Sequence, residues 1–480
     1  MSETIKVPRE LHGKRIIGFT IGFFGVLLTD IFRSVFIFQF YVYTINLNSI
    51  LVTIGMAMQL IISAIFSIIF GVLADNKKPS KLGKRRLFLI YGLPIWFLTN
   101  ILIWLPPWKC PKTNSMFWPT AIYLWIIFIL NAISAMSILT SYASMGPEQS
   151  QTNENRKKVA AVGTFLSIIA SILALMLPLF VQSLLKDPEN VKWWEPSGKV
   201  ILTYIPIIGG LFAIFGFISI ILTFFSVDES FHKISPESEM KKKSVRATFQ
   251  QMIVPAKDKK YRKFVFVGFF TTISTHMLGI LVIPFLTYSL KFRGIDFLLY
   301  VIISFSCKFG WFYIWRIILK KYALIKSYYI CITLTVIASF LELFFLIEIF
   351  SFELKILIFI ITVGTILGSI YGFGLFVGPI TAALIYEAAA KNGVEITDKA
   401  ISEISGAYNG LQSFLLFISR AIASIMIGFI LFGPNEENPI IITIAMSSMG
   451  IFFLIGLIFL RKIELDENIL HKIPLNKRYN

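Results

Sequence analysis

The chain has 480 residues, of which 56% are hydrophobic, with 47 Phe and a formal net charge of +18. This apolar content excludes an ordinary soluble globular protein, because the excess apolar surface needs lipid as its solvent. The positive charge does not indicate nucleic-acid binding, because the cations fall in short segments between long apolar runs. The three cysteines, Cys110, Cys307 and Cys331, predict neither a disulfide framework nor a metal site.

Long apolar runs follow one another along the whole chain. The segment before residue 16 is polar and the first run is too long for a signal-peptide core, so no cleavable signal peptide is expected. A membrane span needs about 20 apolar residues and must be helical to satisfy its backbone groups. About twelve runs meet this requirement, and they cover residues 16–44, 50–74, 87–105, 117–143, 159–185, 200–226, 264–289, 297–319, 327–349, 354–389, 404–432 and 439–460.

The longest polar interruption, residues 227–263, divides these spans six and six. The sequence therefore predicts an all-α membrane protein with an N-terminal six-helix bundle over 1–226 and a C-terminal bundle with a cytoplasmic tail over 264–480. Residues 227–263 form the cytoplasmic loop between them, in which 244–253 has the pattern of a short amphipathic helix on the membrane. Two such halves are typical of parallel-repeat transporters, although no strong residue-level repeat relates them.

Lys and Arg cluster before span one and after the even-numbered spans, and they are sparse on the other side. By the positive-inside rule, both termini should be cytoplasmic. The sequence thus predicts a multi-pass protein of the cell membrane, and we expect it to act as a monomer. Its expected partners are the lipid bilayer and a small-molecule substrate.

The connection between spans two and three carries a charged hairpin, Gly71–Arg86. It reads Gly-Val-Leu-Ala-Asp75, then a Lys-rich turn, then Gly83-Lys-Arg85-Arg86. Asp75 at the end of one helix can meet the cations that begin the next. We therefore expect Gly71, Asp75, Gly83, Arg85 and Arg86 to form a gate at the cytoplasmic side.

Ionisable residues inside spans are costly and mark candidate sites. Asp30 and Arg33 share one face of span one, where they can orient a polar substrate or merely neutralise each other. Arg420 in span eleven is expected to face a central cavity, whereas Lys308 in span eight faces either the cavity or an interface. His276 in span seven is a candidate proton relay or a structural histidine.

Spans nine to eleven supply further candidates. Span ten holds five glycines and Pro379, with Tyr371 and Phe373 alongside, which predicts either an aromatic platform for a sugar ring or close helix packing. Gln412 lies two turns before Arg420. Glu342, towards the outer end of span nine, is expected at the interface.

The hairpin resembles the loop between helices two and three of major facilitator superfamily transporters. Its long gap between Asp75 and Gly83 is similar to the glycoside–pentoside–hexuronide:cation symporter family, to which melibiose permease belongs. Pro147-Glu148 after span four and Tyr386-Glu387 before span eleven also resemble segments of that family. The resemblance implies the major facilitator fold and a substrate site that includes Asp30, Arg33, Tyr371, Phe373, Gln412 and Arg420.

The chain departs from that family on span two. Where sodium-coupled members carry two aspartates, this sequence has Ser63 and Ser67, which supply no negative charge. Candidate cation-coupling residues are therefore Asp30, Ser63, Ser67 and His276. The coupling ion, H⁺ or Na⁺, stays open, as does transport without coupling.

These observations predict a secondary active transporter that moves a small polar solute, a sugar or glycoside, by alternating access. A lysolipid or other non-sugar transporter of the same fold and a non-transporting membrane sensor are the alternatives. An enzyme is not expected, because the four histidines are scattered and no Asp/Glu cluster has catalytic or metal-binding spacing. No cofactor is expected.

Overall fold

The computed structural model describes residues 9–78, 83–229, 244–347, 349–391 and 398–465. Residues 79–82 of the predicted hairpin, residues 230–243 of the central loop and residues 466–480 of the C-terminal tail lie outside these ranges. The first group of helices comprises α1 (Lys14–Phe38) with its π-helical end η1 (Gln39–Thr44), α2 (Ser49–Asn76), α3 (Arg86–Leu102), α4 (Trp118–Gln149), α5 (Asn153–Ser183) and α6 (Pro196–Ser226).

The second group follows a short helix, α7 (Val245–Ile253), and a 3₁₀ turn, η3 (Val254–Lys257). It comprises α8 (Lys259–Pro284) with its π-helical end η4 (Phe285–Ser289), α9 (Asp296–Lys321), α10 (Leu324–Leu341) with η5 (Glu342–Leu346), α11 (Phe352–Lys391), α12 (Asp398–Ile430), η6 (Gly433–Glu436), α13 (Pro439–Ser447) and α14 (Met449–Leu460).

The prediction of an all-α membrane protein is confirmed. Eleven stretches in the described ranges are long and apolar enough to cross a membrane, with α13 and α14 counted as one. The remaining predicted span, 87–105, corresponds to α3, which has 17 residues and ends at Leu102.

Polar residues at the ends of the apolar runs begin several helices. The Asn48 side chain accepts a hydrogen bond from the N–H of Ile50 at the start of α2, at 3.0 Å. Asp258 caps α8 in the same way by accepting from the N–H of Lys260, at 2.8 Å. Such caps satisfy backbone donors that have no partner within the helix, so they fix where each span starts.

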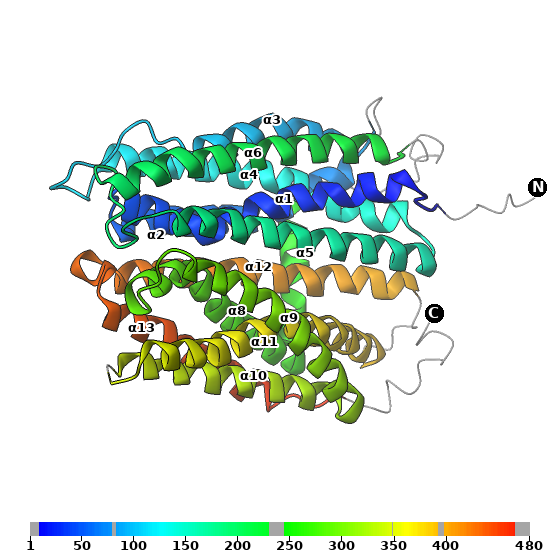
Figure 1. Cartoon of the computed structure of the whole chain (residues 1–480). Helices are drawn as coiled ribbons and strands as arrows, with labels where there is room; N and C mark the ends of the chain where they lie inside the picture. The colour runs from blue at the N-terminus through cyan, green and yellow to red at the C-terminus, as the bar shows by residue number, and fades with distance from the viewer. Residues whose placement is uncertain (1–8, 79–82, 230–243, 348, 392–397, 466–480) are drawn as a thin grey trace, which may run out of the picture.

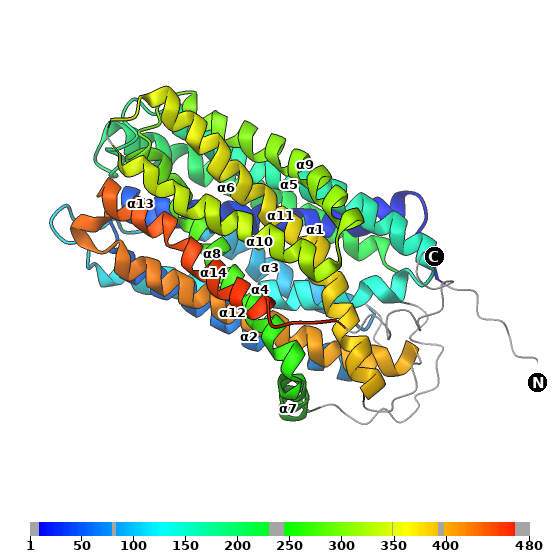
Figure 2. The same cartoon turned by 90° about the horizontal axis from the view of Figure 1, so that it is seen from below.

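The long helices run side by side in two groups, with α1–α6 above α8–α13 in the view of Figure 1. The groups meet where α12 packs along α2 and α5 packs along α9. We call the end where α1 begins the basic end, because the segment with Lys84, Arg85 and Arg86 lies there, and the other end the opposite end. In Figure 2, α7 lies at the edge of the molecule, and it contacts both α2 and α12.

A backbone repeat relates the two groups although the sequence repeat is weak. Each first helix ends in a π-helical turn, a conformation that is often found at functional sites. After η1, the N–H of Ile45 donates to Phe40 O and Asn46 has a positive φ of 68°. After η4, Leu290 donates to Phe285 O and Lys291 has a φ of 56°. The residue numbers in each matching pair differ by the same amount, so Tyr43 corresponds to Tyr288.

Close helix packing within the first group depends on glycines. A Cβ at Gly25 of α1 would lie 1.9 Å from Ser219 Oγ and 2.8 Å from the Cα of Gly216 on α6. Because the second contact is with backbone, α6 itself would have to move. Small residues here let α1 and α6 approach, as is usual in membrane bundles.

Gly25→Val should therefore destabilise the protein by about 1–3 kcal/mol, the usual cost of overpacking. Thermal unfolding of the purified protein in detergent measures the loss. Gly279→Val on α8 is the matched control, because a Cβ at Gly279 has nothing within 4 Å. Equal stability of the two variants would contradict close α1–α6 packing.

Candidate functional site

A central cavity of about 450 Å³ lies between the two groups of helices. It is bounded by α1, α2, α3 and α4 from the first group and by α8 and α12 from the second. Apolar side chains line much of it, Phe23, Trp96 and Phe417 among them. Its polar lining consists of Thr29, Asp30, Arg33, Ser34, Gln59, Ser63, Thr275, His276 and Arg420.

Asp30 and Arg33 form an ion pair in this cavity, as their spacing on one helix face predicts. The Arg33 side chain is 13% exposed and the Asp30 side chain 49%. Arg33 also donates to Asn131 Oδ1 at 2.6 Å, and that oxygen accepts from Gln59 Nε2 at 3.1 Å. Arg33 is thus held from α1, α2 and α4, while Asp30 stays open to the cavity.

Arg420 enters the cavity from α12 on the other side. Arg420 is exposed, and no carboxylate among the described residues lies within ion-pair distance of it. On α8, His276 Nε2 lies 2.9 Å from Ser424 Oγ, and that hydroxyl donates to Arg420 O at 3.1 Å. These two bonds link His276 on α8 to the main chain of α12 at Arg420 through Ser424.

The charges that line the cavity do not cancel. Asp30 and Arg33 neutralise each other, and Arg420 adds one positive charge that no described side chain compensates. A charge without a partner at membrane depth is costly, so it marks Arg420 as a candidate site residue.

Three residues predicted for the substrate site do not line this cavity. Tyr371 is 45% exposed, and its ring packs under Lys308 Nζ, 4.1 Å from the centroid. Phe373 is buried within the second group, with its ring centroid 5.6 Å from that of Tyr328. Gln412 accepts a hydrogen bond from Thr381 at 3.4 Å. None of these three positions of α11 and α12 is part of the cavity lining.

Two further charged residues lie away from the cavity. Lys308 on α9 is 9% exposed and packs against the rings of Phe305 and Tyr371. Glu342, expected at the interface, is instead buried, and neither carboxylate oxygen has a hydrogen-bond partner among the described residues. The η5 turn directs this side chain inward, which the sequence pattern does not reveal.

The two serines on α2 are separated from each other. Ser63 lines the central cavity, whereas Ser67 lines a second cavity of about 380 Å³ nearer the basic end. This second cavity is bounded by α2, α4, α7 and α12, and Gly71 and Asp75 also line it. The serines therefore do not form one cation site in this conformation.

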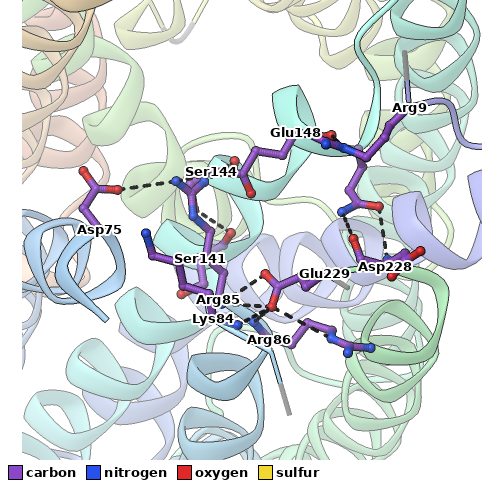
Figure 3. A network of polar contacts seen from close by, with 11 residues as sticks. Arg9, Asp75, Lys84, Arg85, Arg86, Ser141, Ser144, Glu148, Asp228 and Glu229 are labelled. Carbon is purple, nitrogen blue, oxygen red and sulfur yellow. Dashed lines mark hydrogen bonds and ion pairs between the residues drawn. The ribbon is translucent and has the colours of Figure 1, made fainter. Parts of the chain in front are cut away.

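The hairpin residues form a polar network at the basic end (Figure 3). The Arg85 guanidinium lies 3.4 Å from an Asp75 oxygen and 3.1 Å from a Glu148 oxygen, and it donates to Ser144 O. Arg85 thus links α2 to α4. Arg86 instead donates to Val227 O at 3.1 Å after α6.

Glu229, which sequence reasoning missed, anchors this network. Its buried carboxylate accepts from the N–H of Lys84 at 2.6 Å and of Arg85 at 3.0 Å, just before α3. An anion at a helix N-terminus is stabilised by the unpaired N–H groups and by the helix dipole. The turn needs glycine, because Gly83 has a φ of +99° and a Cβ would lie 2.1 Å from Glu229 Oε2.

At the opposite end the two groups touch directly. The Tyr43 and Tyr288 rings stack with centroids 5.3 Å apart, and Tyr43 donates to Glu436 O. Ser49 Oγ donates to Gly428 O at 3.1 Å. Among the described residues, every hydrogen bond and ion pair between α1–α6 and α8–α14, connections included, lies at this end. The cavity is thus closed from the opposite end.

Residues 18–467 match the model of the MFS/sugar transport protein family. The chain belongs to this family. The match confirms the resemblance carried by the hairpin, and it makes the chain a secondary transporter of a small solute rather than an enzyme. A comparison with curated proteins finds no match.

Solved structures of other transporters have the same major facilitator fold. A D-xylose-proton symporter superposes with a TM-score of 0.59 at 13% identity, over 94% of this chain and 97% of its own. The nucleoside transporter NupG gives 0.59 at 12%, over 93% and 100%. A bacterial homolog of the human lysosomal transporter Spinster, in an inward-facing conformation, gives 0.61 at 10%, over 93% and 95%.

Replacing Glu229 tests the anchor of the hairpin. Glu229→Gln replaces a carboxylate that accepts hydrogen bonds from the N–H groups of Lys84, Arg85 and Arg86 with a neutral amide. We therefore expect a loss of about 1–3 kcal/mol in the free energy of unfolding. Thermal unfolding in detergent measures it. Glu154→Gln, which removes an exposed carboxylate, is the control. If Glu229→Gln is as stable as Glu154→Gln, Glu229 does not anchor the hairpin.

Proposed function

We propose that this transporter carries a small hydroxylated solute with one negative charge, a sugar acid such as a uronate. The observation that carries the proposal is Arg420, which faces the cavity opposite the neutral Asp30–Arg33 pair. A carboxylate can accept two parallel hydrogen bonds from a guanidinium and neutralise it at the same time.

The rest of the cavity suits such a solute. Its volume of about 450 Å³ is in the usual range for small-molecule sites. Asp30 can accept hydrogen bonds from sugar hydroxyls, and so can the hydroxyl oxygens of Ser34, Ser63 and Thr275. Trp96 and Phe417 offer apolar surface to the ring faces.

Transport would proceed by alternating access in a cell membrane. The positive-inside rule favours the basic end, with Lys84, Arg85 and Arg86, on the cytoplasmic side. The present conformation, closed at the opposite end, would then be inward-facing. Bundles 1–226 and 264–480 would rock as two units, with the protein acting as a monomer.

The hairpin would gate the cytoplasmic side. In the present conformation Arg85 joins Asp75 to Glu148 within the first bundle, beside the second cavity. Closure of the basic end would bring α12 towards this network and occlude that cavity. Ion pairs of this kind repack as bundles rotate against each other.

We propose H⁺ rather than Na⁺ as the coupling ion. A hard cation prefers anionic oxygen, and Asp30, the carboxylate in the cavity lining, is already paired with Arg33. Ser63 and Ser67 line separate cavities, so they do not converge on an ion.

Charge removal at position 420 tests the substrate class. In proteoliposome counterflow, Arg420→Gln should lose at least about tenfold in uronate transport, because a hydrogen bond to a charged group contributes about 1.5–3 kcal/mol. Lys308→Met, which removes a cation outside the cavity, is the control and should keep the parent rate.

The substrate panel contains a uronate, a neutral glycoside and a lysophospholipid. Preference for the glycoside or the lysophospholipid in the parent protein would refute the sugar-acid proposal. Ligand binding without counterflow would indicate a sensor instead of a transporter.

A further inference from the structure

One carboxylate is half-buried where the two bundles touch at the opposite end. Glu436 lies on η6, between the spans that end at Ile430 and begin at Pro439. Its Oε1 accepts from the N–H of Ser49 at 3.4 Å, and Tyr43 donates to its main-chain oxygen. Glu436 of the second bundle is therefore covered by η1 and the start of α2 from the first.

The surroundings of Glu436 provide little compensation for a negative charge. Lys192, the cation that acts on it, lies 3.8 Å from the neighbouring Glu437 instead. Arg293 is paired with Glu189 at 3.2 Å. The titratable or charged groups that face this corner from every packed element are Tyr43, Asp187, Glu189, Lys192, Tyr288, Arg293 and Glu437.

We propose that Glu436 is a proton-binding site whose occupancy is linked to closure of the opposite end. In the closed conformation the carboxyl group is desolvated by the first bundle. When the bundles separate at this end, Ser49 and Tyr43 withdraw and Glu436 faces water. The two conformations thus differ in their affinity for one proton.

The sign of the linkage follows from burial. Desolvation raises the pKa of Glu436 from its ordinary 4.5 to about 7 in the closed conformation, against smaller opposing effects of Lys192 and the Ser49 hydrogen bonds. Once the bundles separate, the pKa returns towards its ordinary value. Closure therefore takes up a proton between about pH 4.5 and 7, and it becomes less favourable as pH rises through that range.

This linkage adds a direction to the proposed transport cycle. Acid on the side of the opposite end favours closure there, and hence the conformation in which the cavity is reached from the basic end. The site is distinct from the central cavity and from the hairpin, and it does not depend on which solute the cavity binds.

The test measures conformation without substrate. Spin labels are placed on exposed positions of the two bundles at the opposite end, through Met116→Cys and Ile295→Cys, with the native cysteines replaced by serine. Distances are recorded by pulsed electron resonance on the full chain in nanodiscs, from about pH 5 to about pH 8. In the parent protein, the ratio of the closed to the open population should fall at least about tenfold as the pH rises from about 5 to about 8.

Glu436→Gln and Glu436→Ala should both give profiles that are flat with pH, since neither can bind the proton. Glu437→Gln, the matched control in the same turn, should keep the parent profile. A pH-independent parent, or a Glu436 variant with the parent's dependence, would overturn the proposal. An equal effect of Glu437→Gln would overturn it too, and would assign the dependence to the Lys192 pair.

Discussion

Among the described residues, the hydrogen bonds and ion pairs between the two bundles lie at the opposite end, where equivalent pieces of backbone meet. Each first helix ends in a π-helical turn, and the matching tyrosines, Tyr43 and Tyr288, stack on each other. Because each partner comes from the same place in its own bundle, the contact lies close to the pseudo-symmetry axis. Such a joint can open and close as the bundles rotate, with little change inside either one, which is what alternating access needs.

The contact at the opposite end also constrains the central cavity. Asp30, Arg33 and Arg420 face the central cavity between the bundles, and with the opposite end closed we propose that solute reaches it from the basic end. Asp30 and Arg33 are held together within one bundle, whereas Arg420 comes from the other. In the function proposed above, a solute that binds both sides would supply the negative charge that the lining lacks. It would thereby couple the bundles through the site as well as through the joint.

Much of the fold was predictable, because long apolar runs and polar interruptions are direct consequences of the bilayer. Asp30, Arg33 and Arg420 were predictable as cavity residues, since charge at membrane depth is rarely without function. Tyr371, Phe373 and Gln412 were not placed correctly by pattern, because helix rotation decides which face meets the cavity. Glu229 and Glu436 lie in connections, where only the tertiary structure brings a carboxylate to a helix start or to another bundle.

The central claim is that solute crosses only when the joint at the opposite end opens. The most direct test is to link the two bundles across this joint. In the double variant Lys192→Cys, Glu437→Cys, a short bifunctional reagent joins the two thiols through reducible disulfide bonds. The native pair lies across the joint, with 3.8 Å between Lys192 Nζ and a Glu437 oxygen. We predict that linked protein in proteoliposomes stops transporting but still binds solute from the basic end, and that reduction of the link restores transport. Transport at the unlinked rate by fully linked protein would contradict the account.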